Sequence, residues 1–169
     1  MANPTYTLIA SNTVGSGGVS SVTFSSIPAT YTDLVVKLSV RNSNAANSAQ
    51  VFTSVNGSAG SSRVLRGSGS AASSFTDSSA IETARASAAS STANTFSNIE
   101  LYFPNYTSAI AHSISSDGVS EDNSSTAYAE LAAGLSSSTA AITSLTFDTN
   151  GSGNFVQYST AYLYGISNS

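Results

Sequence analysis

The chain has no cysteine, no tryptophan and only three prolines among its 169 residues. Without cysteine it can form neither a disulfide bond nor a thiolate metal site, and its redox compartment is undetermined. No stretch approaches the roughly 18 apolar residues of a membrane span. The N-terminal residues also lack the basic region and apolar run of a signal peptide. We therefore expect a chain that is made in the cytoplasm and left soluble, with no membrane partner.

Charge is scarce as well. Lys, Arg, Asp and Glu supply 8 % of the residues, against about 25 % in an average soluble domain. Serine and threonine supply about a third, so the polarity comes from hydroxyl groups. The five cations lie apart in the sequence and predict no basic patch, which argues against a nucleic-acid partner. With so few charges to keep monomers apart, we expect the chain to function in an assembly.

No segment shows a convincing helical period, whereas short runs alternate apolar and polar residues. The clearest run is 33–41, in which Leu34, Val36 and Leu38 face one way; a helix would scatter them around its circumference. Turn signals recur every 8–15 residues between nine or ten such runs. The pattern predicts an all-β fold, an antiparallel, jelly-roll-like β-sandwich in one domain of residues 1–169.

The C-terminal end is expected to organise this fold as a hairpin, with strands at 142–147 and 154–166 and a turn at 148–153. Both faces of the last strand carry apolar or aromatic groups, so it should lie inside a sheet or against a partner chain. Asn56-Gly57 predicts a second hairpin turn, after a strand at 49–55.

Three other segments lead to more specific expectations. Residues 67–95 are rich in Ser, Ala and Gly and predict a surface excursion with little core content. Within it, 81–88 fits either one or two helical turns or an edge strand. Ile110, His112 and Ile114 are expected on one strand face, and 117–123 as an acidic loop. Further strands are expected at 6–10, 21–25, 99–103 and 128–135.

The candidate chemical groups do not form a recognisable active site. His112 is the only histidine, lacks a nucleophile elbow, and fits a structural or interface role better than a catalytic triad. Residues 148–153 match the opening of a calcium loop, but position twelve is Ser159, so a turn is preferred. The acidic group at 117–122 is read as a solvated loop, and nothing marks Glu82, Glu100 or Glu130 as a glycosidase pair. No catalytic, cofactor or metal residues are predicted, and the chain is not expected to be an enzyme.

Eight tyrosines are numerous for a chain without tryptophan. Exposed aromatics serve both sugar-binding platforms and subunit interfaces, although packing is the plainer interpretation for those within strands. The candidate subunit-interface residues are Tyr158, Tyr162, Tyr164 and Ile166.

Several segments, taken in order, resemble a family of small β-rich virion proteins of tailed bacteriophages. They are Ile27–Val36 with Val40-Arg41, Phe103–Tyr106, Ile142–Phe147, Gly153–Phe155 with Ser159, and Leu163–Ile166. The similarity runs from about Tyr6 to Ile166, and its most specific parts are Pro-Ala-Thr-Tyr-Thr-Asp-Leu and the terminal Leu-Tyr-Gly-Ile. Residues 67–94 depart from the family pattern because they are richer in alanine and serine.

This resemblance implies a non-enzymatic structural role on the particle. We expect a capsid decoration (cement) protein that binds the major capsid protein on the head surface of the virion, as a homotrimer or other small cyclic homo-oligomer. The alternatives are a tail-fibre or receptor-binding domain that recognises host surface glycan, and, ranked last, a hydrolase of envelope polysaccharide.

Overall fold

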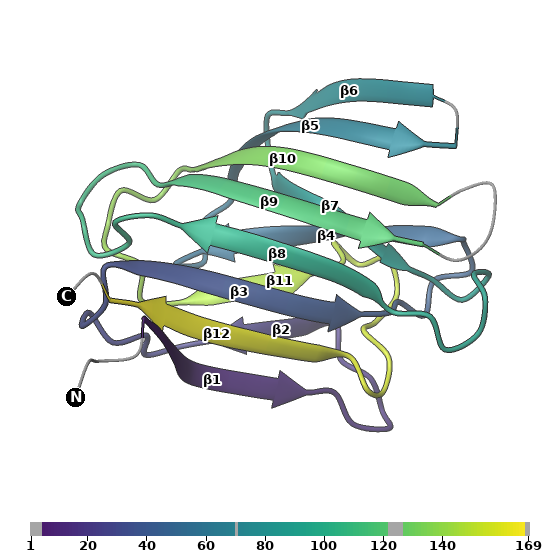
Figure 1. Cartoon of the computed structure of the whole chain (residues 1–169), viewed down its shortest axis with the longest axis horizontal. Coiled ribbons are helices and arrows are strands. Elements are labelled where there is room, and N and C mark those ends of the chain that lie inside the picture. The colour runs from purple at the N-terminus through teal and green to yellow at the C-terminus, as the bar shows by residue number, and fades with distance from the viewer. Residues whose placement is uncertain (1–4, 70, 122–126, 168–169) are drawn as a thin grey trace.

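The computed structural model of the chain describes residues 5–69, 71–121 and 127–167, which form twelve strands and no helix. The strands build two antiparallel sheets that pack face to face (Figure 1). This confirms the predicted all-β antiparallel sandwich. The expected nine or ten strands were too few, and the jelly-roll comparison is approximate because the sheets hold eight and four strands. No helix long and apolar enough to cross a membrane occurs in the described ranges.

The larger sheet has eight strands in the order β1 (Tyr6–Thr13), β12 (Thr160–Ile166), β3 (Asp33–Val40), β8 (Ser97–Phe103), β9 (Ser113–Ser120), β10 (Tyr128–Ser136), β5 (Gly60–Ser68) and β6 (Ala71–Asp77). The smaller sheet has four strands in the order β2 (Ser21–Phe24), β11 (Leu145–Asp148), β4 (Ser48–Val55) and β7 (Ile81–Ser87). The smaller sheet covers one face of the larger one and leaves the opposite, outer face bare (Figure 1).

The C-terminal segments do not form the expected hairpin. β11 pairs with β2 and β4 in the smaller sheet, whereas β12 lies between β1 and β3 in the larger one. The chain between them crosses from one sheet to the other and is fixed where buried Phe155 bridges to Val19 and Asn42. The separation places Leu145 and Phe147 on one side of the core and Leu163 on the other.

The Asn56-Gly57 turn also joins the two sheets. Both residues have positive φ, 51° and 72°, and the amide of Val55 donates to the carbonyl of Ser58, so the tight turn itself is present. The chain then leaves β4 and enters β5 in the larger sheet. The expected hairpin between these strands is therefore wrong, because a tight turn reverses the chain without determining which sheet it joins next.

Three further expectations need correction. Residues 81–87 form β7, an edge strand of the smaller sheet, and Ile81, Ala84, Ala86 and Ala88 belong to the buried core. The expectation of little core content thus fails for this part of 67–95, while β6 is largely exposed. Ile110 and His112 both precede β9 and lie outside any strand; Ile110 is exposed whereas His112 and Ile114 are buried, so the expected shared strand face is wrong. Residues 117–120 belong to β9, and 122–126 lie outside the described residues.

The core between the sheets changes character along the larger sheet. Beneath β12, β3 and β8 it is apolar, with fully buried Leu34, Leu101 and Phe103. Beneath β9, β10 and β5 the inward side chains include Ser62, Ser116 and Glu130. This polar half of the interior and the two halves of the outer face are the parts of the molecule that bear on function.

Candidate functional site

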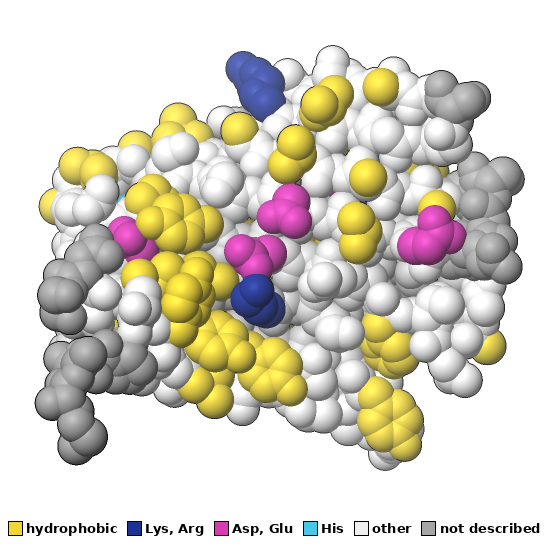
Figure 2. All heavy atoms as spheres, in the orientation of Figure 1, with side chains coloured by type: hydrophobic (Ala, Val, Ile, Leu, Met, Phe, Trp, Pro, Cys, Tyr) yellow, Lys and Arg dark blue, Asp and Glu magenta, His cyan; other side chains and the backbone are white. Residues whose placement is uncertain are grey.

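The outer face of β1, β12, β3 and β8 carries a cluster of four tyrosines and one leucine, which we call the aromatic patch: Tyr6, Leu8, Tyr102, Tyr162 and Tyr164. The rings of Tyr6 and Tyr164 meet edge to face with centroids 6.3 Å apart, and those of Tyr162 and Tyr164 stack at 6.5 Å. Figure 2 shows hydrophobic side chains gathered over this part of the sheet. Leu8 and Tyr6 are each 52 % exposed.

Strand register explains how distant residues reach this patch. Val35 lies between Tyr164 on β12 and Tyr102 on β8, and it is only 1 % exposed although it points outward. Ile166 is paired with Tyr6 and is likewise buried. Of the candidate interface residues, the structure therefore gathers Tyr162, Tyr164 and Ile166, with Ile166 underneath the patch.

Tyr158 lies apart from that group. It occupies a turn before β12 and is 69 % exposed, the most exposed large hydrophobic side chain described. Its φ is 72°, and the amide of Ser159 donates to the carbonyl of Val156 across the turn. A bulky residue at positive φ is strained, so the fold holds this ring in solvent at an energetic penalty.

One ion pair borders the aromatic patch. Lys37 Nζ donates to Glu100 Oε2 at 2.5 Å, with both side chains about half exposed. The Glu100 carboxylate raises the pKa of Lys37 above 10.5, through the hydrogen bond first and the opposite charge second. Such surface pairs contribute about 0–1 kcal/mol to folding stability. The main effect of this pair is therefore to fix the positions of one positive and one negative charge on this face.

Three of the segments that carry the family resemblance, Ile27–Val36, Phe103–Tyr106 and Leu163–Ile166, meet at one corner of the sandwich, whereas Arg41, Phe155 and Ser159 lie at the other end of β3. The Tyr106 hydroxyl donates to the Pro28 carbonyl, and the amide of Tyr31 donates back to that hydroxyl at 3.3 Å. Asp33 accepts hydrogen bonds from the Tyr102 hydroxyl at 2.8 Å and the Asn105 amide at 2.7 Å. A Cβ at Gly165 would lie 2.2 Å from Cγ of Tyr31, so only glycine fits beneath that ring. These motif residues build the corner.

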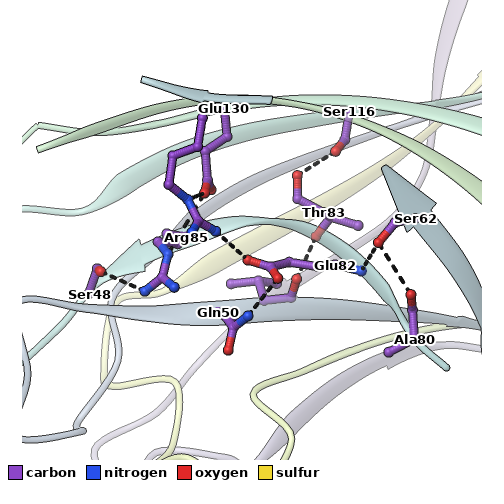
Figure 3. A network of polar contacts seen from close by, with 11 residues as sticks. Ser48, Gln50, Ser62, Ala80, Glu82, Thr83, Arg85, Ser116 and Glu130 are labelled. Carbon is purple, nitrogen blue, oxygen red and sulfur yellow. Dashed lines mark hydrogen bonds and ion pairs between the residues drawn. The ribbon is translucent and has the colours of Figure 1, made fainter. Parts of the chain in front are cut away.

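A buried charged network occupies the space between the sheets beneath β10 and β5 (Figure 3). Arg66 on β5 bonds both carboxylates of the network: Nη2 donates to Glu82 Oε1 at 2.8 Å, and Nε donates to Glu130 Oε1. Arg85 Nε lies 3.8 Å from the same Glu130 oxygen, and Gln50 Nε2 donates to Glu82 Oε2 at 2.5 Å. The side chains of Glu82 and Glu130 are 0 % and 1 % exposed.

Aromatic rings close the open side of this network. The Arg66 guanidinium lies 4.6 Å from the Phe75 ring centroid and 5.6 Å from that of Tyr128, and Arg85 lies 5.2 Å from Tyr128. With two arginines and two glutamates the network is formally neutral, which is the condition for burying charge at a tolerable energy. Burial is the main cause that raises the pKa of Glu82; Gln50 and Arg66 oppose it, and Glu130 adds to it.

The geometry of the network fits a structural role, in which it holds the two sheets together, better than a catalytic one. A glycosidase pair flanks a substrate across a cleft, whereas Glu82 and Glu130 share one arginine inside the sandwich. The sequence did not mark them as a pair, because their association depends on β5, β7 and β10 meeting in space. Local alternation pointed the other way: Arg66 and Glu130 each alternate with a leucine, and an ordinary strand pattern would place the leucine inward and the charge outward, whereas here the leucines are exposed.

The other candidate groups have local structural partners. His112 is buried, its Nε2 lies 3.0 Å from the Ala140 carbonyl oxygen, and its Nδ1 has no hydrogen-bond partner among the described residues. At 148–153 the Asp148 carboxylate accepts from the Asn150 amide at 2.8 Å, as in a turn. Within 5–69, 71–121 and 127–167, no three His, Asp or Glu side chains are close enough to share a metal ion.

The outer face of β9, β10 and β5 carries a second apolar cluster, which we call the leucine face: Leu65, Val119, Leu131 and Leu135. Leu131 and Leu65 are directly opposite each other in the sheet and are 60 % and 54 % exposed. The apolar side of β10 thus faces solvent, while Glu130 on its other side faces the interior.

A scan against protein-family models finds no match for this chain, and a search of curated proteins finds no significant match.

Proposed function

We propose that this chain is a structural protein of a tailed-bacteriophage virion. We further propose that it is a capsid decoration protein that binds the major capsid protein on the head surface. The observation that carries this proposal is the bare outer face of the eight-stranded sheet, with the aromatic patch at one side and few charges. Protein interfaces are enriched in such aromatic groups and depleted of charge at their centres.

The resemblance to virion proteins supports the same assignment. Three of the resembling segments meet in one corner of the fold, through Tyr31, Tyr106 and Gly165, so these motif residues form part of the structural framework. That corner adjoins the aromatic patch, because Tyr102 donates to Asp33 and flanks Val35. A small cyclic oligomer, such as a trimer, would present several aromatic patches to the capsid at once and so gain avidity.

Sedimentation with empty heads of the corresponding phage tests this function. The wild-type chain should bind the heads saturably. A double variant, Tyr6→Ala with Tyr162→Ala, should bind at least about tenfold more weakly, a loss of about 1.4 kcal/mol. Ile110→Ser is the matched control, since Ile110 is 53 % exposed and lies outside the patch. Absence of head binding by the folded wild-type chain would contradict the proposal.

A second candidate is glycan recognition at the tail, and one observation favours it. Tyr158 presents its ring to solvent from a strained turn, and backbone strain of this kind clusters at functional sites. Glycan-array binding that Tyr158→Ala abolishes, together with antibody labelling at the tail, would favour this candidate over head decoration.

A further inference from the structure

The leucine face is centred on β10, whose apolar and polar sides are reversed relative to those of an ordinary sandwich strand. On β10 the outward residues are Ala129, Leu131, Ala133 and Leu135, with no charge among them. Leu131 is 60 % exposed, and its neighbours Leu65 and Val119 are also about half exposed. Figure 2 shows hydrophobic side chains on this part of the face. Exposed apolar clusters of this kind mark interaction sites.

Two charged residues flank this strand on opposite sides. Arg63 projects from β5 beside Ala133, and Asp117 projects from β9 beside Leu131. Neither forms an ion pair within the described parts of the chain. Asp117 is also directly opposite Glu100, whose own cation is Lys37. Like charges placed opposite each other destabilise a sheet, so this side of the face lacks a cation.

We propose that two copies of this chain pack with their leucine faces together, around a two-fold axis that runs along β10. Rotation about that axis exchanges the β9 side for the β5 side. Each Arg63 then faces the Asp117 of the other copy, while Leu131 and Leu135 meet their own equivalents. This is the isologous, self-complementary arrangement of a two-fold interface.

The spacings permit this contact. Arg63 is in register with Ala133 and Asp117 with Leu131, a displacement of two residues, or about 7 Å, along the strand. An arginine side chain spans that distance. Because the axis runs along β10, each outward leucine of one copy meets the same leucine of the other, and these leucine pairs fill the roughly 10 Å spacing of packed sheets. An axis perpendicular to β10 in the plane of the contact would instead place β9 on β9 and β5 on β5, so Arg63 could not face Asp117.

A second copy fits this face better than a foreign protein because the face supplies both halves of the charge pairing. The contact does not rest on the virion assignment: it concerns the isolated chain and uses a different surface from the aromatic patch. The aromatic patch lies on other strands of the same sheet and is not needed for this contact, and the two-fold axis directs the patches of the two copies to opposite sides of the dimer.

Charge reversal tests the pairing in trans. Arg63→Asp alone and Asp117→Arg alone should each weaken dimerisation at least about tenfold in sedimentation velocity, about 1.4 kcal/mol. An equimolar mixture of the two variants should recover the dimer as a heterodimer, because each chain then supplies the charge that the other lacks. Native mass spectrometry distinguishes that heterodimer from either homodimer by mass.

Further variants define the outcomes. The double variant, Arg63→Asp with Asp117→Arg, should dimerise by itself, and Leu131→Asp should be monomeric in any mixture. Ile110→Ser should dimerise as the wild type does. A wild-type chain that stays monomeric would assign the face to another occupant and overturn the proposal. Equal dimerisation of the single variants and the wild type, or no recovery on mixing, would also overturn it.

Discussion

At the scale of single residues, Tyr158 is the clearest case of a side chain held against its backbone preference. It occupies the third position of the turn from Val156 to Ser159, with φ at 72°, where glycine or asparagine is usual. Its ring is mostly exposed, so it gains little from burial in the isolated chain. A contact outside the chain would explain why tyrosine is present.

We expect Tyr158→Asn to raise the free energy of unfolding by about 1 kcal/mol, because asparagine tolerates positive φ and little buried area is lost. Urea denaturation measures the change. The same variant should weaken binding of whichever partner uses this turn, in a head-binding or glycan assay. A variant less stable than the wild type would show that the ring stabilises the turn.

Asn56, unlike Tyr158, makes side-chain hydrogen bonds within the chain. Its Nδ2 donates to the Ala141 carbonyl at 2.9 Å, and its Oδ1 accepts from the amides of Thr143 and Ser144. It therefore ties the sheet-crossing turn after β4 to the segment that enters β11.

Asn56→Asp should lower the free energy of unfolding by about 1–3 kcal/mol at neutral pH, since a carboxylate would face the Ala141 carbonyl and lose the donor. Asn150→Asp is the matched control: Asn150 also precedes glycine at positive φ, 47°, and is exposed. Denaturant unfolding should show a change below about 0.5 kcal/mol for the control. Equal effects of the two substitutions would contradict a stabilising role for the hydrogen bonds of the Asn56 side chain.

At the scale of strands, β7 approaches the larger sheet at a glycine. A Cβ at Gly118 on β9 would lie 2.4 Å from Cβ of Ala84 on β7, and neither atom can move without its backbone. The close approach brings β7, and with it Glu82 and Arg85, within reach of β10 and β5.

Gly118→Ala should therefore destabilise the fold by about 1–3 kcal/mol through overpacking. Gly17→Ala provides the control, because a Cβ there meets nothing within 4 Å and its φ is not positive. Thermal unfolding of the two variants compares them directly. If Gly118→Ala left the stability unchanged, the two sheets would be able to separate locally without a loss of stability.

The raised pKa of Glu82 predicts how the network responds to pH. The folded state binds this proton more tightly than the unfolded chain does, so the associated stability is present below the ordinary carboxyl pKa of 4.5. It is lost as pH rises through the raised value. Relative to Glu82→Gln, the wild type should lose stability as the pH rises from below 4.5 through the raised pKa of Glu82.

Urea unfolding of both proteins across that range measures the difference, with Glu100→Gln as an exposed control. A difference that stayed constant with pH, or that favoured the wild type increasingly at high pH, would show that Arg66 holds Glu82 ionised throughout.

Local alternation predicted many of the strands, but it missed β5 and β6, left β7 open and did not identify the strand partners. The runs around Val36, Leu101 and Leu131 all form strands, because period-two patterns need no tertiary information. The crossings after Val55 and Asp148 were missed because turn chemistry reverses the chain without selecting a sheet. The inward position of Glu130 depends on Arg66 of a neighbouring strand, which no local pattern reveals.

The candidate site was predictable in the same partial way. Alternation along β12 places Tyr162 and Tyr164 on one face, as the last strand suggested. Tyr6 and Tyr102 join them only through the register of β1 and β8 within the larger sheet. The leucine face needed the further fact that β10 buries its charged side.

At the scale of the whole molecule, the smaller sheet covers one side of the larger sheet and leaves two apolar areas on the other (Figures 1 and 2). On the outer face of the larger sheet, Lys37, Glu100 and Asp117 are neighbours on β3, β8 and β9, and they lie between the aromatic patch and the leucine face. This division suits a subunit that meets two partners at once, one on each area.

A reconstruction of the virion by electron cryomicroscopy tests that account most directly. We predict density for this sandwich on the head surface, with the aromatic patch against the capsid and the leucine face against a second copy. Density that places the chain elsewhere, or that leaves the outer face of the eight-stranded sheet open to solvent, would contradict it.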